Sequence, residues 1–291
     1  MATPAAEIEI DPQLVGALLA KQLPELAGLP IRIVANGWDN TIARIGAQWL
    51  VRLPRRAAAA ELVVNEQVWL PVLAPQLPLD VPVPWFCGKP DAHYPWAWSV
   101  CRWLPGETAA VAPPIDLAAT AVALASFIEA LHRPAPPEAP ISPFRGVSLQ
   151  ARAEAVVDRA HLLEATIDTS RVLRTWDRLR STPAWEGPAL WLHGDLHPSN
   201  MLTLDGRLSA VIDFGDICAG DPATDLALAW MMFPAEERAL FRELANVDEH
   251  TWHRAAGWAL NLSLAYMTGD DSTSMPAIGR ATLHEVLEEF S

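Results

Sequence analysis

Two short segments in the second half of the chain constrain its fold most strongly, because each carries an acidic residue from a strand end into a loop. The apolar run Ala189–Leu192 predicts a strand that leads to Asp195, and Asn200 lies five residues beyond Asp195. A second short strand is predicted to end at Asp213. Carboxylate and amide oxygens are the hard ligands that Mg²⁺ prefers. The pattern therefore predicts that Asn200 and Asp213 bind Mg²⁺ under a polyphosphate, with Asp195 beside an attacking hydroxyl.

The order and spacing of these residues resemble a known family. His-x-Asp-x-x-x-x-Asn at 193–200, followed by Asp-Phe-Gly at 213–215, is the phosphoryl-transfer arrangement of protein kinases. With Gly-Asp-Pro-Ala-Thr-Asp-Leu-Ala at 220–227, the stretch is similar to the aminoglycoside/macrolide phosphotransferase family, whose members are small-molecule kinases. The resemblance is tight over residues 190–230 and weaker over residues 30–290.

The resemblance implies an α+β, bilobal protein-kinase-like fold. Residues 1–104 would form a small N-terminal antiparallel-sheet lobe that clamps the nucleotide and ends in the hinge. Residues 105–291 would form a larger, mostly helical C-terminal lobe with the catalytic loop and the acceptor pocket. In this family the second aspartate of the Gly-Asp-Pro stretch, Asp225 here, braces the catalytic loop from below.

Three side chains of the catalytic stretch have competing interpretations. His193-x-Asp195-x-His197 alternates like metal ligands on a strand, which is typical of a metal hydrolase. Pro198 argues against a continuing strand because proline supplies no hydrogen-bond donor to the ladder. We predict that His193 braces the loop, and that His197 either faces substrate or, with slightly more weight, is a solvated loop residue.

A predicted turn early in the chain supplies two candidate nucleotide contacts. The predicted strands Ile31–Ala35 and Thr41–Ile45 flank a segment that contains Gly37 and Asn40. This segment is either an ordinary hairpin loop or, as the resemblance implies, the loop whose backbone N–H groups cover the nucleotide phosphates.

Arg52 is the candidate phosphate clamp. The predicted strand Trp49–Leu53 lies where a kinase places its phosphate-binding lysine, but the only lysines are Lys21 and Lys89. Arginine is permanently charged and binds phosphate through two donors, so we favour Arg52 over the alternative of an exposed strand arginine. In the predicted helix 57–73, Glu66 lies where it would orient the clamp; the alternatives are a solvated glutamate, or Glu61 as the partner.

The segment Ser99–Leu104 resembles the hinge between the lobes, where backbone groups bind the purine edge. Cys101 and Trp103 are its candidate contacts, although Trp103 could equally pack in the core. Because such recognition runs through the main chain, the sequence favours neither ATP nor GTP as co-substrate.

The second half of the chain is predicted to be helical. Asp116 is expected to cap a helix that ends near Leu131, and 148–180 is expected to be a helical insert whose acids are mostly solvated. Asp221 is expected to cap a helix that opens with Pro222. Helices are also predicted at 11–27, 235–245, 248–268 and 275–290, with an acidic turn at 269–272 as a candidate cation site.

Composition limits the classes of partner. The formal charge of −14 disfavours nucleic acid, because backbone binding needs clustered lysine and arginine. Three widely spaced cysteines fit free thiols in a reducing cytoplasm, and the acidic N-terminus is unlike a signal peptide. The apolar segments are too short to cross a membrane, and the sequence gives no oligomeric state.

Together these features predict a small-molecule kinase that transfers the γ-phosphoryl group of ATP or GTP to a hydroxyl, with Mg²⁺. The expected acceptor is antibiotic-like: an amino sugar would suit the acidic chain, and a macrolide would suit the 13 tryptophans. Two alternatives stay open at this point. One is a metabolic kinase for an amino alcohol or a sugar, and the other is a non-catalytic nucleotide-binding pseudokinase.

Overall fold

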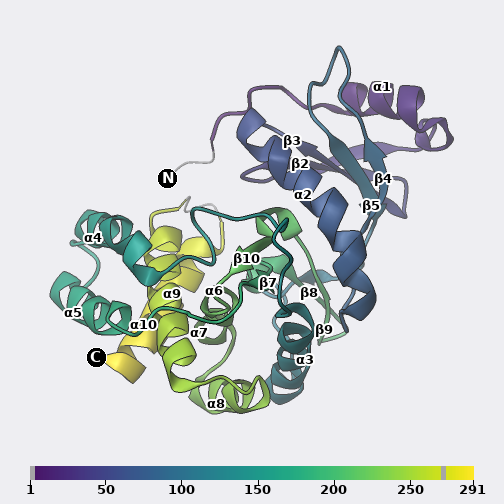
Figure 1. Ribbon diagram of the computed structural model, residues 1–291. Coiled ribbons are helices and arrows are strands. Elements are labelled where there is room, and N and C mark those ends of the chain that lie inside the picture. The colour runs from purple at the N-terminus through teal and green to yellow at the C-terminus, as the bar shows by residue number, and fades with distance from the viewer. Residues whose placement is uncertain (1–3, 270–272) are drawn as a thin grey trace. The chain divides into compact units, whose positions relative to one another are not determined.

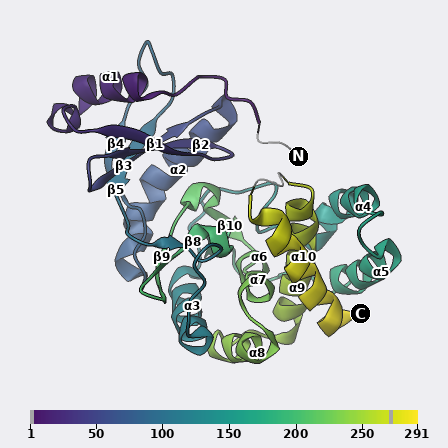
Figure 2. The ribbon, with the colours of Figure 1, turned by 180° about the vertical axis from the view of Figure 1, so that it is seen from behind.

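The computed structural model describes residues 4–269 and 273–291, so most of the predicted acidic turn lies outside the described residues. The described chain divides into two compact units. The N-terminal unit comprises residues 4–75 and Asp80–Pro105, and the C-terminal unit comprises Gln76–Leu79, residues 106–269 and residues 273–291. Figures 1 and 2 show the elements of each unit from two sides.

The N-terminal unit is built on one antiparallel sheet. Its strands run in the order β1-β2-β3-β5-β4, and each pairs antiparallel with its neighbours. Their bounds are β1 Ile31–Asn36, β2 Asn40–Ile45, β3 Trp49–Pro54, β4 Pro84–Gly88 and β5 Trp98–Arg102. Strand β4 begins at Pro84, and Pro82 just before it offers no N–H to a ladder.

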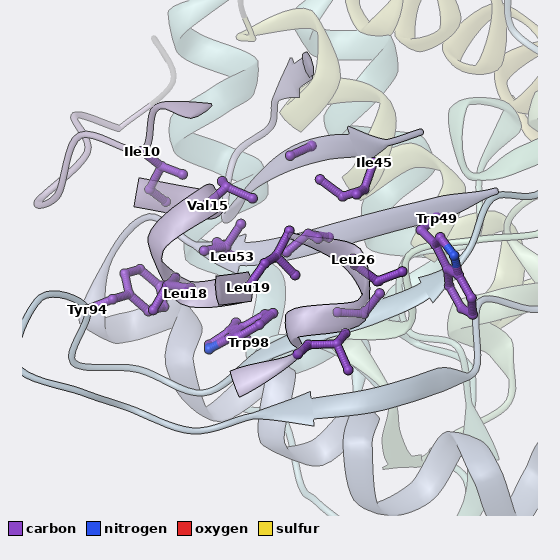
Figure 3. Packing of buried hydrophobic residues seen from close by; sticks show 14 residues of the cluster. Ile10, Val15, Leu18, Leu19, Leu26, Ile45, Trp49, Leu53, Tyr94 and Trp98 are labelled. Atoms are coloured by element: carbon purple, nitrogen blue, oxygen red, sulfur yellow. The ribbon is translucent and has the colours of Figure 1, made fainter. Parts of the chain in front are cut away.

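Side chains on strand β3 alternate between the two faces of this sheet. Val51 and Leu53 join the apolar cluster that includes Leu18 and Leu19 of helix α1 (Pro12–Gln22). Figure 3 shows Leu53 among the side chains of this cluster. Helix α2 (Ala57–Leu73) packs against β3, β4 and β5. Arg52 lies between Val51 and Leu53 in sequence, so its side chain leaves the opposite face of the sheet from theirs.

Helix α1 is shorter than the predicted helix 11–27. Its N-terminus agrees with the sequence signals, since Asp11 accepts a hydrogen bond from the Leu14 N–H and proline opens the helix. It stops at Gln22 because the following Leu23 precedes Pro24, and a residue before proline disfavours the helical conformation. A 3-10 turn, Pro24–Leu26, continues the chain.

The C-terminal unit contains two small sheets that carry the loops of the motif. One pairs β7 with β10, and the other runs in the order β6-β8-β9. The strand that leads to Asp195 is therefore held by the strand that follows Asp213 in sequence, with Leu192 opposite Cys218. The bounds are β6 Glu107–Thr108, β7 Leu190–Leu192, β8 Met201–Leu204, β9 Arg207–Val211 and β10 Cys218–Gly220.

Eight helices of this unit surround those sheets. Helix α9 is the central one, because it is buried over most of its length and α4, α5, α6 and α10 all contact it. The helix bounds are α3 Leu117–Leu131, α4 Ala153–Leu162, α5 Thr169–Arg180, α6 Ala223–Leu226, α7 Ala229–Met232, α8 Ala235–Leu244, α9 Glu249–Met267 and α10 Met275–Phe290. The predicted α+β class is confirmed, and none of the described helices is long and apolar enough to span a bilayer.

Candidate active site

A buried carboxylate organises the loop that follows β7. The side chain of Asp225 accepts hydrogen bonds from the backbone N–H groups of His193 and Gly194, both at 2.8 Å. The ring of His132, at the end of α3, lies 3.2 Å from the same carboxylate. Burial raises the pKa of Asp225, but these donors and the nearby imidazoles outweigh it, so the pKa is lowered. Asp225 thus fixes the backbone of the two residues that directly precede Asp195.

The ring of His193 uses both of its nitrogens within the loop. Nδ1 accepts from the Asp195 N–H at 3.2 Å, so the proton lies on Nε2, which donates to the Ile212 carbonyl at 2.9 Å. The ring is fully buried, and burial lowers the pKa of His193 and keeps it neutral. An imidazole engaged in this way cannot join Asp195 as a metal ligand, so the metal-hydrolase interpretation is wrong.

Gly194 lets the loop turn tightly. Its φ is +85°, and a Cβ at this position would lie 2.3 Å from the Asp216 carbonyl oxygen. We expect Gly194→Ala to lower the free energy of unfolding by about 2–3 kcal/mol, because the backbone conformation and the contact both disfavour a side chain. Urea unfolding measures this loss. Gly28→Ala is the matched control, since no atom lies within 4 Å of its added Cβ; equal losses in both variants would contradict the steric argument.

Asp195 is held on both sides. Arg145, from the loop after α3, donates to Oδ1 at 2.7 Å, and the ring of His197 lies 3.2 Å from Oδ2. Burial raises the pKa of Asp195, but the charge of Arg145 and the contact with His197 outweigh it and keep the pKa well below its ordinary range. A carboxylate held ionised in this way can accept a hydrogen bond from a hydroxyl. The preferred interpretation of His197 as a solvated loop residue is wrong, because its side chain is buried against Asp195.

A backbone hydrogen bond between Asn200 and Ile212 brings the two candidate metal ligands, Asn200 and Asp213, close together. The Asn200 amide nitrogen donates to the Asp195 carbonyl at 2.9 Å, and the Asn200 carbonyl accepts from the Ile212 N–H at 2.9 Å. A carbonyl only accepts, so Asn200 must turn its Nδ2 to Asp195 and its Oδ1 away. Asp213 follows Ile212, is exposed, and has left-handed backbone angles (φ 65°, ψ 64°) that are uncommon outside glycine. An outward amide oxygen and an exposed carboxylate fit the donor set of a hard divalent cation.

The predicted clamp pair is formed within the N-terminal unit. Arg52 Nη1 donates to Glu66 Oε1 at 2.9 Å, and both side chains are buried. The alternatives of an exposed strand arginine and a solvated glutamate are therefore wrong, and Glu61 is exposed. Because the pair is buried, the Glu66 carboxylate, and not solvent, determines where the Arg52 guanidinium lies.

The turn that contains Gly37 and Asn40 is a closed hairpin. The Gly37 N–H donates to the Asn40 carbonyl at 2.8 Å, and Arg55 donates to the Gly37 carbonyl at 2.7 Å. The ordinary hairpin interpretation thus describes the local hydrogen bonding.

The predicted hinge residues lie in and just after β5. Cys101 is buried within the strand, opposite Leu50 of β3. The Trp103 N–H already donates to the Gln48 carbonyl at 2.8 Å, and the Arg44 guanidinium lies 4.2 Å from the centre of the Trp103 ring.

Several residues of the site escaped the sequence analysis. Arg145 and His132 lie 50 and 93 residues from the aspartates that they contact, so no local pattern marks them. The prediction that Asp221 caps a helix opening with Pro222 is wrong, because α6 begins at Ala223 and has Pro222 at its N-cap position. Asp221 instead accepts from the Ala223 N–H at 3.0 Å and forms a buried ion pair with Arg254 at 2.7 Å. Among these partners, only Arg254 had a signal in the sequence, namely a charged residue within the otherwise largely apolar helix α9.

The comparisons with known proteins agree with this geometry. A profile of the phosphotransferase enzyme family matches residues 30–258 of the chain. The chain belongs to the phosphotransferase enzyme family. That membership makes it an enzyme. The chain is also similar to YcbJ of Bacillus subtilis (strain 168), an uncharacterized protein: the two are 24% identical over 75% of this chain and 77% of the relative.

Solved structures show the same fold at low identity. The GDP complex of aminoglycoside 2'-phosphotransferase-IIIa is 17% identical, covers 96% of this phosphotransferase and 99% of its own chain, and has a TM-score of 0.70. The macrolide 2'-phosphotransferase MphH from Brachybacterium faecium is 19% identical, covers 96% and 97%, and has a TM-score of 0.60. The predicted resemblance and the kinase-like fold are both confirmed.

Proposed function

We propose that this phosphotransferase transfers the γ-phosphoryl group of a nucleoside triphosphate to a hydroxyl of a small molecule. The observation that carries the proposal is the carboxylate of Asp195, which is fixed between Arg145 and His197 and joined through its backbone to Asn200. Phosphoryl transfer needs such positioning of donor, acceptor and charge more than it needs a reactive side chain.

Each residue has a defined part in the proposed transfer. Asp195 accepts a hydrogen bond from the acceptor hydroxyl, aims its oxygen at the γ-phosphorus, and receives its proton as the new P–O bond forms. The bond from the γ-phosphorus to the bridging oxygen breaks in the same step, and the nucleoside diphosphate leaves. Asn200 and Asp213 would hold Mg²⁺, which supplies charge neutralisation for the triphosphate when bound. Arg52, oriented by Glu66, would contact the α- and β-phosphates through its guanidinium.

The nucleotide and the acceptor are supported to different degrees. Related structures are complexes with GDP or with ATP, so either purine nucleotide suits the proposal. Cys101 and Trp103 would border the base, and the turn at Gly37 and Asn40 would lie over the phosphates. The relatives' complexes contain kanamycin, gentamicin or streptomycin, and others are macrolide enzymes, which supports an aminoglycoside or macrolide hydroxyl as the acceptor and a cytoplasmic role in antibiotic resistance.

A coupled nucleotide-turnover screen tests this function. ATP and GTP, each with Mg²⁺, are offered with aminoglycosides, macrolides, amino alcohols and sugars, and product phosphate is located by mass spectrometry. A phosphorylated acceptor supports the proposal. Saturable nucleotide binding without turnover on any acceptor, and without slow hydrolysis, would instead support a pseudokinase.

Asp213→Ala is expected to lower turnover by about a hundredfold or more, because Mg²⁺ would lose its only charged ligand from the chain in this proposal. Raising the Mg²⁺ concentration should recover part of the loss, and isothermal titration with Mg²⁺ and nucleotide reports the weakened binding. Asp80→Asn removes an exposed carboxylate of the other unit and serves as the control. Unchanged Mg²⁺ dependence in Asp213→Ala would exclude this residue as a ligand.

A further inference from the structure

Arg145 contacts Asp195, and Arg152 and Arg159 lie close enough to Arg145 for their charges to interact with its charge. We call Arg145, Arg152 and Arg159 the arginine cluster. Arg152 and Arg159 are seven residues apart at the start of and within α4, so two helical turns bring them to the same side. The Arg152 guanidinium lies 5.6 Å from the ring centre of Phe144, the residue before Arg145. Both views of the ribbon show α4 beside α9, where Asn261 accepts from Arg159 at 3.3 Å.

The positive charge of the arginine cluster is only partly compensated. Arg145 is paired with Asp195 at 2.7 Å and with Asp216 at 3.6 Å. Arg152 and Arg159 form no ion pair with any carboxylate in the part of the chain that the structure describes. Burial and the charges of Arg159 and Arg145 lower the pKa of Arg152. Burial and the charge of Arg145 lower the pKa of Arg159, although the charge of Asp158 partly opposes them. Like charges held this close repel one another, and an anion between them would relieve the repulsion.

Two donors in the same region have no acceptor. Arg152 Nε and the Tyr266 hydroxyl are buried atoms without a hydrogen-bond partner among the described residues. Tyr266 lies near the end of α9, with its ring 5.7 Å from the ring of His197, which contacts Asp195. Buried donors are normally satisfied, so two orphaned donors beside uncompensated arginines indicate an absent acceptor group.

We infer that the arginine cluster and the Tyr266 hydroxyl bind an anionic group of the acceptor molecule. The substrate class is therefore a hydroxy compound that carries a carboxylate, sulfate or phosphate near the hydroxyl offered to Asp195. This inference rests on the proposed phosphoryl transfer to a hydroxyl, and it replaces the aminoglycoside or macrolide acceptor by an anionic one. A polycationic aminoglycoside would meet repulsion from Arg152 and Arg159, while the acidic side chains of α4, at 154 and 158, lie at other helix positions and are exposed.

The terminal phosphate of the nucleotide offers the same anionic chemistry, so the test must separate the two sources. Sulfate is the probe. It is titrated by calorimetry, and a chloride salt keeps the ionic strength constant. One titration uses the free enzyme, and a second uses enzyme saturated with Mg²⁺ and a non-hydrolysable ATP analogue. We expect saturable sulfate binding in both. Sulfate binding that the analogue abolishes would assign the arginine cluster to the nucleotide and overturn the inference.

The double variant Arg152→Gln/Arg159→Gln is expected to weaken sulfate binding about tenfold to a hundredfold, because each charged hydrogen bond to an anion contributes about one factor of ten or more. Arg174→Gln is the control: it removes one positive charge, where the double variant removes two, from an exposed position on α5. Sulfate affinity that is equal in the wild type, the double variant and the control would overturn the inference. So would loss of the same size in Arg174→Gln, because the effect would then be general electrostatics.

Kanamycin provides an opposing probe. We expect no phosphorylation of kanamycin, and an efficient transfer to it would overturn the anionic-acceptor inference while supporting the proposed function. Failure of the proposed function itself would give different results. The wild type would then not bind nucleotide in a Mg²⁺-dependent manner, or the Asp213→Ala substitution would leave that binding unchanged. The melting temperature of the double variant should match that of Arg174→Gln. If the double variant unfolds, Arg159→Gln alone is titrated with sulfate, and the same criteria apply: an affinity equal to that of the wild type, or a loss equal to that in Arg174→Gln, would overturn the inference.

Discussion

Replacing Asp195 by asparagine is expected to lower the turnover number by about 10²–10⁴-fold, the range for losing a positioned proton acceptor. The amide has the size of the carboxylate, but it carries no charge to accept the hydroxyl proton. Nucleotide affinity should change little, because Asn200 donates to the backbone carbonyl at position 195, which the substitution keeps. Initial rates at saturating substrates measure the first effect, and calorimetry with Mg²⁺ and nucleotide measures the second.

Asp216→Asn is the control for this prediction. Asp216 is the second carboxylate near Arg145, at 3.6 Å, so its neutralisation changes the local charge without removing the hydroxyl's partner. We expect a much smaller loss of turnover in Asp216→Asn than in Asp195→Asn. Near-normal turnover in Asp195→Asn would remove Asp195 from the proposed mechanism.

Asp225→Ala is expected to cause the largest loss of stability, about 3–5 kcal/mol, which is typical of breaking a buried charged network. The substitution leaves two backbone N–H groups of the catalytic loop and the ring of His132 without their acceptor. Because the unsatisfied groups precede Asp195 directly, turnover should fall together with stability. Urea unfolding at pH 7, followed by fluorescence and circular dichroism, reports the free energy.

Two controls separate this network from an ordinary helix cap. Asp225→Asn keeps one acceptor oxygen and should lose less, whereas Asp168→Ala removes the exposed cap of α5 and should lose only about 1 kcal/mol. The lowered pKa of Asp225 fixes the sign of the pH effect. Its stabilisation is complete above about pH 4, the ordinary aspartate pKa, and is lost as the pH falls through the lower folded-state value. Equal losses in Asp225→Ala and Asp168→Ala would refute the role of the network.

The elements were largely predictable because their signals are local. Helix α2 has the predicted bounds, Ala57–Leu73, and the N-cap of α3 is Asp116, as expected. The error at α1 also has a local cause, because Pro24 ends the helix earlier than predicted. The charges around Asp195 were not predictable in this way, because the net charge of −14 describes the whole chain and the arginine cluster is local.

The sequence by itself determined the family, the strand-and-loop arrangement of the motif, and the chemical types at positions 195, 200 and 213, because these depend on residue order and short spacing. Only the tertiary structure decided what surrounds Asp195. Arg145 approaches it from a loop 50 residues earlier, and Tyr266 lies on a helix far along the chain. Contacts between such distant segments depend on tertiary packing, which is a property of the folded chain rather than of any segment within it.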